Sequence, residues 1–156
     1  MRDCEAIAAD MPHTRIIQVM DREADFFELF NAWRDSPKRT ELLVRAHHDR
    51  RTDTELSLFD GISASEVRGQ FLLHIDRQSA RAKKSKQKAR PARPERTSEM
   101  TLRYRQVVLL PPKHLPDKKP VSLWLIHLDE EHPPADAVPI EWFILTTMKV
   151  DSPEMA

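Results

Sequence analysis

Lys and Arg side chains are concentrated between residues 77 and 105, where they could bind nucleic-acid phosphates. This stretch holds eleven of the 25 basic residues and two of the 25 acidic residues, so its balance is +9 and that of the remaining chain is −9. Basic side chains bind a DNA backbone by releasing its counterions, without reading its base sequence. The alternative is a solvated insertion that keeps a sheet edge soluble. A run this dense favours binding of nucleic acid, and its candidate residues are Lys83, Lys84, Lys86, Lys88, Arg90 and Arg93.

Two acidic side chains near the start of the chain could face one site. Asp25 follows Asp21 by about one helical turn, so on a helix the two would lie on the same side. An acidic pair early in a helix is more often solvated and favoured by the helix dipole. We therefore expect the solvated arrangement for Asp25.

The histidines and the cysteine do not predict a metal site or a nucleophile. His47 and His48 are adjacent, and His132 follows His127 by five residues. Neither spacing puts two ligands on one side of a regular strand or helix. Cys4 is the one cysteine of the sequence, which excludes an internal disulfide and a thiolate cluster within the chain. No local signature of a nucleophilic triad surrounds it.

Asp21 comes at the end of a short apolar run. Residues 14–20, TRIIQVM, predict a buried strand, and the acidic, helix-forming residues after it predict a helix over 22–34. The apolar face of this helix consists of Phe26, Phe30 and Trp33. Residues 41–46 predict a second strand. The three elements form a strand–helix–strand unit, which implies a parallel pair of strands.

The second part of the chain predicts strands joined by proline-rich or charged connections. These strands are expected at residues 66–76, 99–110, 121–129 and 139–147. Successive strands without crossover helices favour an antiparallel sheet. The last two strands are apolar on both faces, so we expect them to be central or covered. A short helix near residues 56–62 leads into this sheet.

Glycine content and hydropathy exclude several classes of protein. The chain has two glycines, Gly61 and Gly69, so it contains no glycine-rich loop for nucleotide phosphates. No apolar run approaches the roughly 20 residues that span a bilayer, and the first ten residues are too polar for a signal peptide. We therefore expect a cytoplasmic protein without a membrane partner.

An ordered set of short motifs resembles one enzyme family. The run IIQVMDREADFFELF is similar to the second catalytic-aspartate motif of bacterial cut-and-paste insertion-sequence transposases, which form the DDE class. The resemblance is to the branch that contains the transposon-five transposase. The runs LLVRAHHDRR, RPAR and PIEWFILTT match the same family in the same order. Together these motifs span almost the whole chain.

The resemblance implies an α/β (α+β) fold with a partial ribonuclease H-like core. Residues 1–47 would form its strand–helix–strand layer, and residues 48–150 would form a mostly antiparallel β insertion. The basic run would be a loop at residues 79–96. Residues 151–156 would begin a helix.

Asp21 is the catalytic residue and metal ligand that the resemblance implies. In this family, two Mg²⁺ or Mn²⁺ ions held by three carboxylates activate the attacking oxygen and stabilise the leaving oxygen at a DNA phosphate. The first Asp would precede this stretch. The Glu would lie on a helix that Ser152 caps and Pro153 begins. With one carboxylate of three, we expect a fragment that is inactive alone and does not hold the ions tightly.

Two further residues match positions that contact DNA in the family. Arg45 matches an arginine that contacts phosphate near the active site, and the alternative is an ordinary exposed arginine at a strand end. Trp142 matches an indole that stacks on a flipped base during hairpin formation. The alternative for Trp142 is a core residue between Ile140 and Ile144.

The predicted function is that of a fragment of a cut-and-paste DNA transposase, whose intact parent cleaves and transfers DNA strands with a metal ion. The partner would be double-stranded DNA at transposon ends, and the protein would be associated with the bacterial nucleoid. The alternatives are a non-catalytic DNA-binding module, an inhibitor of a full-length transposase, or a remnant without a role. An incomplete core would leave Phe26, Phe30 and Trp33 short of partners, so a homodimer that covers them is a further expectation.

Overall fold

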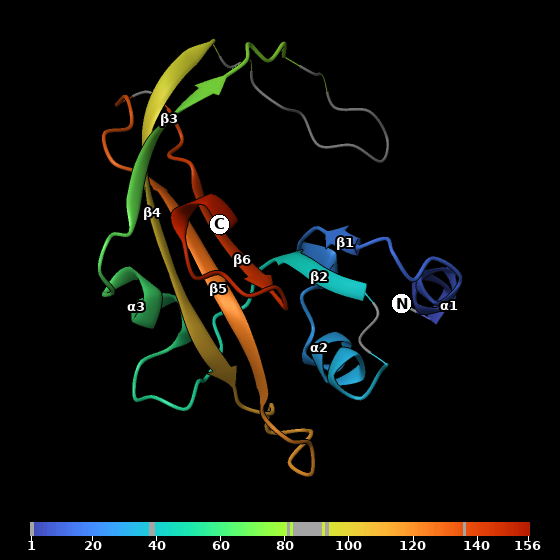
Figure 1. Cartoon of the computed structure of the whole chain (residues 1–156). Helices are drawn as coiled ribbons and strands as arrows, with labels where there is room; N and C mark the ends of the chain where they lie inside the picture. The colour runs from blue at the N-terminus through green and yellow to red at the C-terminus, as the bar shows by residue number, and fades with distance from the viewer. Residues whose placement is uncertain (1, 38–39, 81, 83–91, 93, 136) are drawn as a thin grey trace.

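One mixed sheet organises the chain. The computed structural model describes residues 2–37, 40–80, 82, 92, 94–135 and 137–156. The helices and 3₁₀ turns of this part are α1 (Arg2–Asp10), η1 (Arg22–Ala24), α2 (Phe27–Arg34), α3 (Leu58–Ser63) and η2 (Pro153–Met155). The strands are β1 (Ile16–Met20), β2 (Thr40–Arg45), β3 (Gly69–Ile75), β4 (Arg96–Leu109), β5 (Val121–Glu130) and β6 (Glu141–Thr146). The sheet order is β1-β2-β6-β5-β4-β3, and the fold is α+β (Figure 1).

The strand–helix–strand unit predicted at the start of the chain is present. β1 and β2 are parallel neighbours, with Val19 opposite Leu43, and α2 connects them. All other neighbouring strands pair antiparallel, as predicted for the second part. The two parts meet where β6 pairs with β2, at Arg45 and Ile144. The carboxyl end of β2 therefore lies beside a strand from the far end of the chain.

The two faces of the sheet bury different side chains, because successive residues of a strand point to opposite sides. α2 and α3 contribute to the main core on one face, in which Phe30 and Leu125 are fully buried. On the opposite face Ile126 packs with Val150, which follows β6. The prediction that the strands at 121–129 and 139–147 are central is confirmed, since β5 and β6 occupy the middle of the sheet.

The predicted helix over residues 22–34 is wrong at its start. A 3₁₀ turn, η1, comes first, and α2 begins at Phe27 because Phe26 has an extended backbone, with φ −130° and ψ 143°. This break exposes Phe26, of which 46% is accessible, and buries Phe27 in its place. Phe30 is fully buried, so the expectation that it would lack partners is also wrong.

The two ends of the chain lie on different parts of the sheet. α1 lies beside β1 and β2 (Figure 1), where the buried carboxylate of Glu5 accepts a hydrogen bond from the hydroxyl of Thr40 at 2.7 Å. At the other end, Ser152 is extended and Pro153 opens η2, but the side chain of Ser152 forms no capping bond. The helix predicted from residue 151 onward is therefore a 3₁₀ turn within the described chain. None of the helices in the described ranges has the length and apolar character needed to cross a bilayer.

Candidate nucleic-acid interface

Asp21, Arg45 and Trp142, selected in separate motifs of the sequence, lie together in the structure. Asp21 directly follows β1 and Arg45 ends β2, and the carboxyl ends of parallel strands meet at one edge of a sheet. A guanidinium nitrogen of Arg45 lies 3.8 Å from a carboxylate oxygen of Asp21. The centre of the same guanidinium lies 5.5 Å from the centroid of the Trp142 ring. Arg45, at the end of β2, thus lies between the carboxylate that follows β1 and the indole on β6.

The register of the sheet explains the contact between Arg45 and Trp142. Arg45 is directly opposite Ile144, and Trp142 is two residues before Ile144 on β6. Both side chains therefore point to the same face, as a diagonal pair within reach of each other. Trp142 is 41% exposed, so the alternative that it is a buried core residue is wrong. An exposed indole with an adjacent arginine offers a surface on which a base can stack.

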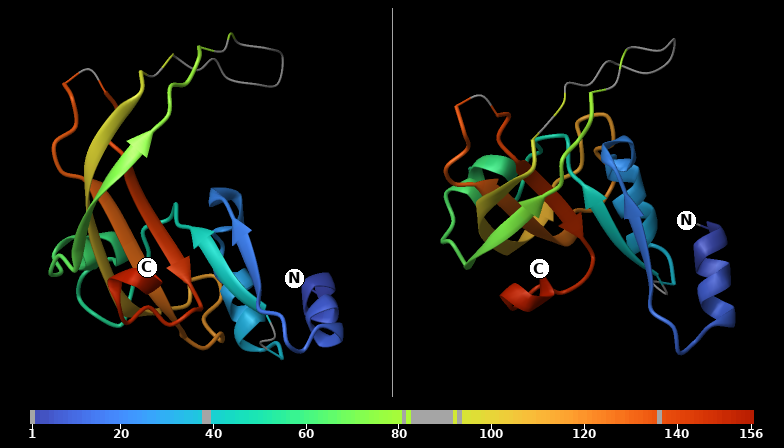
Figure 2. Two further views of the ribbon diagram at one scale, coloured as in Figure 1. Left: turned by 45° about the horizontal axis from the view of Figure 1, so that its top comes forward. Right: turned by 90° about the horizontal axis from the view of Figure 1, so that it is seen from above.

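Two hollows in the surface share Arg45 and Trp142 in their walls. A groove of about 530 Å³ is lined by Arg22, Arg45, His74, Ile140 and Trp142, among others. His74 belongs to β3, which is four places from β2 in the sheet, and the sheet curls so that these strands border one groove (Figure 2). Positive charge and exposed apolar surface are thus combined along its walls.

The second hollow is smaller and mainly apolar. Its volume is about 270 Å³, and its walls include Val19, Leu43 and Ile144 together with Arg45 and Trp142. Val19 is 72% exposed, which is unusual for a large apolar side chain in a parallel strand pair. This open apolar surface continues the face on which the Trp142 ring lies.

Asp21 belongs to no group of three potential metal ligands among the described residues. Asp21 is exposed and paired with Arg45, and Asp25 is turned into the protein. The groups in the described ranges are Glu99 with Glu131 and His132, and His127 with Asp129 and Glu141, of which Glu141 also lines the groove beside Trp142. A pair of divalent cations requires several oxygen ligands. One exposed carboxylate, that of Asp21, does not fit such a pair.

Asp25 is buried, so the predicted solvated arrangement is wrong. Its carboxylate accepts hydrogen bonds from the backbone N–H groups of His47 and His48, at 2.6 and 2.8 Å. It also forms an ion pair with Arg50 at 2.5 Å. The cause of the error is the break between η1 and α2, which directs Asp25 inward instead of along a helix surface.

Sequence reasoning missed a buried histidine on β5. His127 is 2% exposed, its Nε2 lies 3.2 Å from a carboxylate oxygen of Glu141, and its ring stacks on Phe143. Its Nδ1 has no hydrogen-bond partner among the described residues. Burial lowers the pKa of His127, and the hydrogen bond to Glu141 opposes this effect only in part. The signal in the sequence was the two-residue spacing of His127 and Asp129, which puts both on one face of a strand.

A second buried network supports the start of β6. The carboxylate of Glu130 accepts hydrogen bonds from Arg96 at 2.8 Å, Ser98 at 2.7 Å and the backbone N–H of Ile140 at 2.9 Å. Burial alone would raise the pKa of Glu130, but the bonds from Ser98 and Ile140 and the charge of Arg96 outweigh it and lower the pKa. The network connects β4, β5 and the residue before β6, two positions from Trp142.

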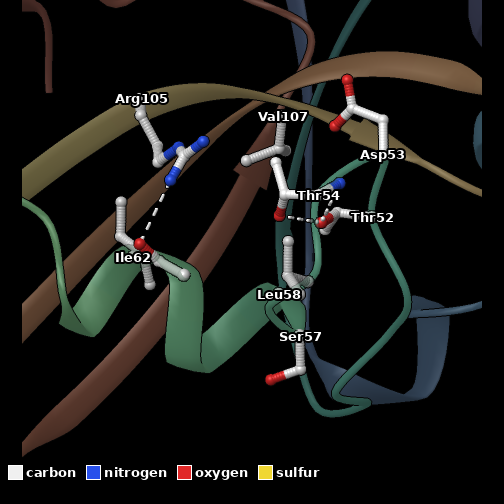
Figure 3. A pocket seen from close by; sticks show the side chains of 9 residues that line it. Thr52, Asp53, Thr54, Ser57, Leu58, Ile62, Arg105 and Val107 are labelled. Atoms are coloured by element: carbon white, nitrogen blue, oxygen red, sulfur yellow. Dashed lines mark hydrogen bonds between the residues drawn. The ribbon is translucent and has the colours of Figure 1, made fainter.

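A small cavity between α3 and β4 is not a ligand site. Its volume is about 10 Å³, which is room for about one water molecule (Figure 3). Arg105 projects toward α3, where its guanidinium donates a hydrogen bond to the carbonyl oxygen of Gly61 at 3.2 Å. The hydroxyls of Thr52 and Thr54 are bonded to each other at 2.8 Å. Arg105, Thr52 and Thr54, which line the cavity, are therefore engaged with protein partners.

The candidate phosphate-binding residues of the basic run lie outside the described residues. They are Lys83, Lys84, Lys86, Lys88, Arg90 and Arg93. The described strands that flank this run are β3 and β4, whose adjacent ends extend beyond the other strands at the top of Figure 1.

No family model matches the chain.

Proposed function

We propose that the chain is part of a DDE-class cut-and-paste DNA transposase and that it binds DNA at the face formed by Asp21, Arg45 and Trp142. The observation that carries this proposal is the meeting of these three side chains, at 3.8 and 5.5 Å from the guanidinium of Arg45. Each was selected from a different motif of the sequence. Their convergence on one exposed face is what a shared role in binding DNA requires.

Each side chain has a distinct role in the proposed interface. Arg45 donates hydrogen bonds to a DNA phosphate, for which its planar guanidinium is suited. The exposed ring of Trp142 stacks on a base that has left its pair. Asp21 is the carboxylate that joins the metal site of a complete catalytic centre. The basic residues of the run at 79–96 add phosphate contacts that are independent of base sequence.

We expect this 156-residue chain to bind DNA without cleaving it. Strand cleavage by this class of enzyme requires divalent cations held by several carboxylates. Asp21 belongs to neither group of three potential metal ligands among the described residues. This observation favours, as a second candidate, a non-catalytic DNA-binding module that competes with a full-length transposase for DNA.

The strand–helix–strand unit at the start of the chain supports this proposal. We infer that β1, α2 and β2 correspond to one layer of a ribonuclease H-like core and that β3 to β6 belong to the β insertion. The parallel pairing of β1 with β2, with α2 between them, supports this inference. The acid that follows β1 is then at the position expected for the second catalytic Asp.

Substitution of Trp142 tests the stacking role. The change Trp142→Ala should weaken binding of a fluorescein-labelled DNA hairpin by about 1–3 kcal/mol, the usual contribution of stacking on one base. The matched change Trp142→Phe keeps an aromatic ring and should retain most of the affinity. Fluorescence anisotropy at low salt measures both dissociation constants, and gel electrophoresis with Mg²⁺ or Mn²⁺ measures cleavage. Equal affinity of Trp142→Ala and the parent chain would contradict the stacking role.

A further inference from the structure

The loop that follows β2 is bonded to the turn that follows β1. The buried carboxylate of Asp25 accepts the backbone N–H groups of His47 and His48, at 2.6 and 2.8 Å, and a guanidinium N–H of Arg50 at 2.5 Å. A second N–H of Arg50 donates to the backbone carbonyl oxygen of Asp25 at 2.7 Å. These four hydrogen bonds all connect residue 25 to residues 47–50.

The charges of this cluster depend on each other. The side chain of Asp25 is 0% exposed and that of Arg50 is 13% exposed, so neither charge is well solvated. Removing one partner leaves the other buried and unpaired, which is far more costly than losing an exposed ion pair. The turn after β1 and the loop after β2 are therefore held in one arrangement.

The same loop also reaches the strand that carries Trp142. The backbone N–H of Ala46 donates to the carbonyl oxygen of Phe143 at 2.7 Å. Ala46 directly follows Arg45, and Phe143 directly follows Trp142. The loop is thus bonded on one side to Asp25, which lies four residues after Asp21, and on the other side to β6.

We propose that Asp25 and Arg50 are positioning residues, which hold Arg45 between Asp21 and Trp142 without contacting DNA themselves. The proposal rests on the proposed function in so far as the positioned site is the DNA-binding one. Its geometric part can be tested without DNA. When the clamp formed by Asp25 and Arg50 is broken, Arg45 loses its fixed position over the indole.

Fluorine NMR of 5-fluorotryptophan-labelled protein measures this position. The chain has three tryptophans, and the variant Trp142→Phe identifies the resonance of Trp142 by its disappearance. The test variant is Asp25→Asn, which keeps the size of the side chain and removes its charge. The pair Asp25→Asn/Arg50→Gln leaves no unpaired buried charge and serves where the single variant does not fold.

The matched control is Glu5→Gln. Glu5 is also a buried carboxylate, and it bonds to Thr40 at the opposite end of β2 from Arg45. The side chain of Trp33 donates to the carbonyl oxygen of Thr40 at 2.9 Å, so this control should shift the resonance of Trp33. Asp25→Asn, or the pair, should shift or broaden the resonance of Trp142 more than those of Trp33 and Trp124. An unchanged Trp142 resonance in a folded clamp variant would overturn the proposal.

DNA binding separates failure of this proposal from failure of the proposed function. In the parent chain, Arg45→Ala should weaken hairpin binding about fivefold to tenfold. In the Asp25→Asn/Arg50→Gln background the same change should weaken it by less than about twofold, because Arg45 is already misplaced. An equal loss in both backgrounds would overturn the positioning role. If Arg45→Ala has no effect in the parent chain, the proposed function fails, and the fluorine spectra still decide whether the clamp positions Arg45.

Discussion

At the scale of single residues, the central feature is that Arg45 has two different neighbours. Asp21 offers it an exposed carboxylate, and Trp142 offers it the face of an indole. An exposed ion pair contributes little to stability, so in the proposed interface the pairing with Asp21 would be exchanged for a phosphate at small cost. The cation–π contact keeps the guanidinium near the face of the ring during that exchange.

A second residue-scale feature is His127, whose neutral form is favoured by burial. Besides Glu141, the charged groups that act on it are Asp129 and Arg103, and its ring stacks on Phe143. Because its pKa is lowered in the folded state, the unfolded state binds more protons once the pH falls below the usual histidine value of about 6.5. The contribution of His127 to stability is therefore full above this pH and decreases as the pH falls toward its folded pKa.

The prediction is that the free energy of unfolding decreases from pH 7 to pH 5 more steeply in the parent chain than in His127→Gln. Urea denaturation, monitored by circular dichroism at several pH values, measures this difference. Glu130, whose pKa is lowered, affects stability only at more acidic pH and does not enter this window. Parallel pH dependences of the parent and His127→Gln would contradict the inferred neutral state.

At the scale of elements, β5 stabilises the fold because side chains on both of its faces are buried, as Leu125 and Ile126 are. Leu125 on β5 is fully buried, whereas Leu72 on the edge strand β3 is 72% exposed. Leu125→Ala should lower the free energy of unfolding by about 2–5 kcal/mol, through lost burial and the cavity left behind. The same change at Leu72 should cost less than about 0.5 kcal/mol. Urea denaturation measures the free energy of unfolding of both variants. Similar losses for Leu125→Ala and Leu72→Ala would contradict the larger contribution of β5.

The sequence predicts strands well and the junction at Asp25 poorly, for physical reasons. Apolar patterning locates β1, β2 and the four later strands, because burial determines which residues alternate or stay apolar. The spacing of Phe26, Phe30 and Trp33 also fits a helix, but Phe26 is extended and α2 begins at Phe27, while Asp25 before it pairs with Arg50, 25 residues along the chain. Local periodicity contains no information about such a distant partner.

Local sequence patterns also do not predict the contacts within the candidate site. The resemblance to a known motif selects Asp21, Arg45 and Trp142 individually, yet their contact depends on the antiparallel pairing of β2 with β6. These strands are far apart in the sequence, and nothing local predicts that they are neighbours. The same pairing, through Ala46 and Phe143, is what allows Asp25 to act on the site.

At the scale of the whole molecule, a neutral net charge conceals a strongly basic segment. Residues 77–105 carry a balance of +9, and the remaining chain carries −9. Opposed charges of this size orient a polyanion toward one side of a protein. This segment begins two residues after β3 and ends within β4, and His74 of β3 lines the groove that contains Arg45 and Trp142.

The most direct test of the proposed DNA-binding face is the salt dependence of hairpin binding, measured by fluorescence anisotropy for the parent chain, Arg45→Ala and Arg68→Ala. Arg68 is an exposed arginine before β3 that is paired with the exposed Glu66, and it serves as the matched control. Arg45→Ala should weaken binding about fivefold to tenfold and reduce the slope of log K against log salt by about one unit, while Arg68→Ala should change neither. Identical affinities and slopes for all three proteins would contradict DNA binding at the face formed by Asp21, Arg45 and Trp142.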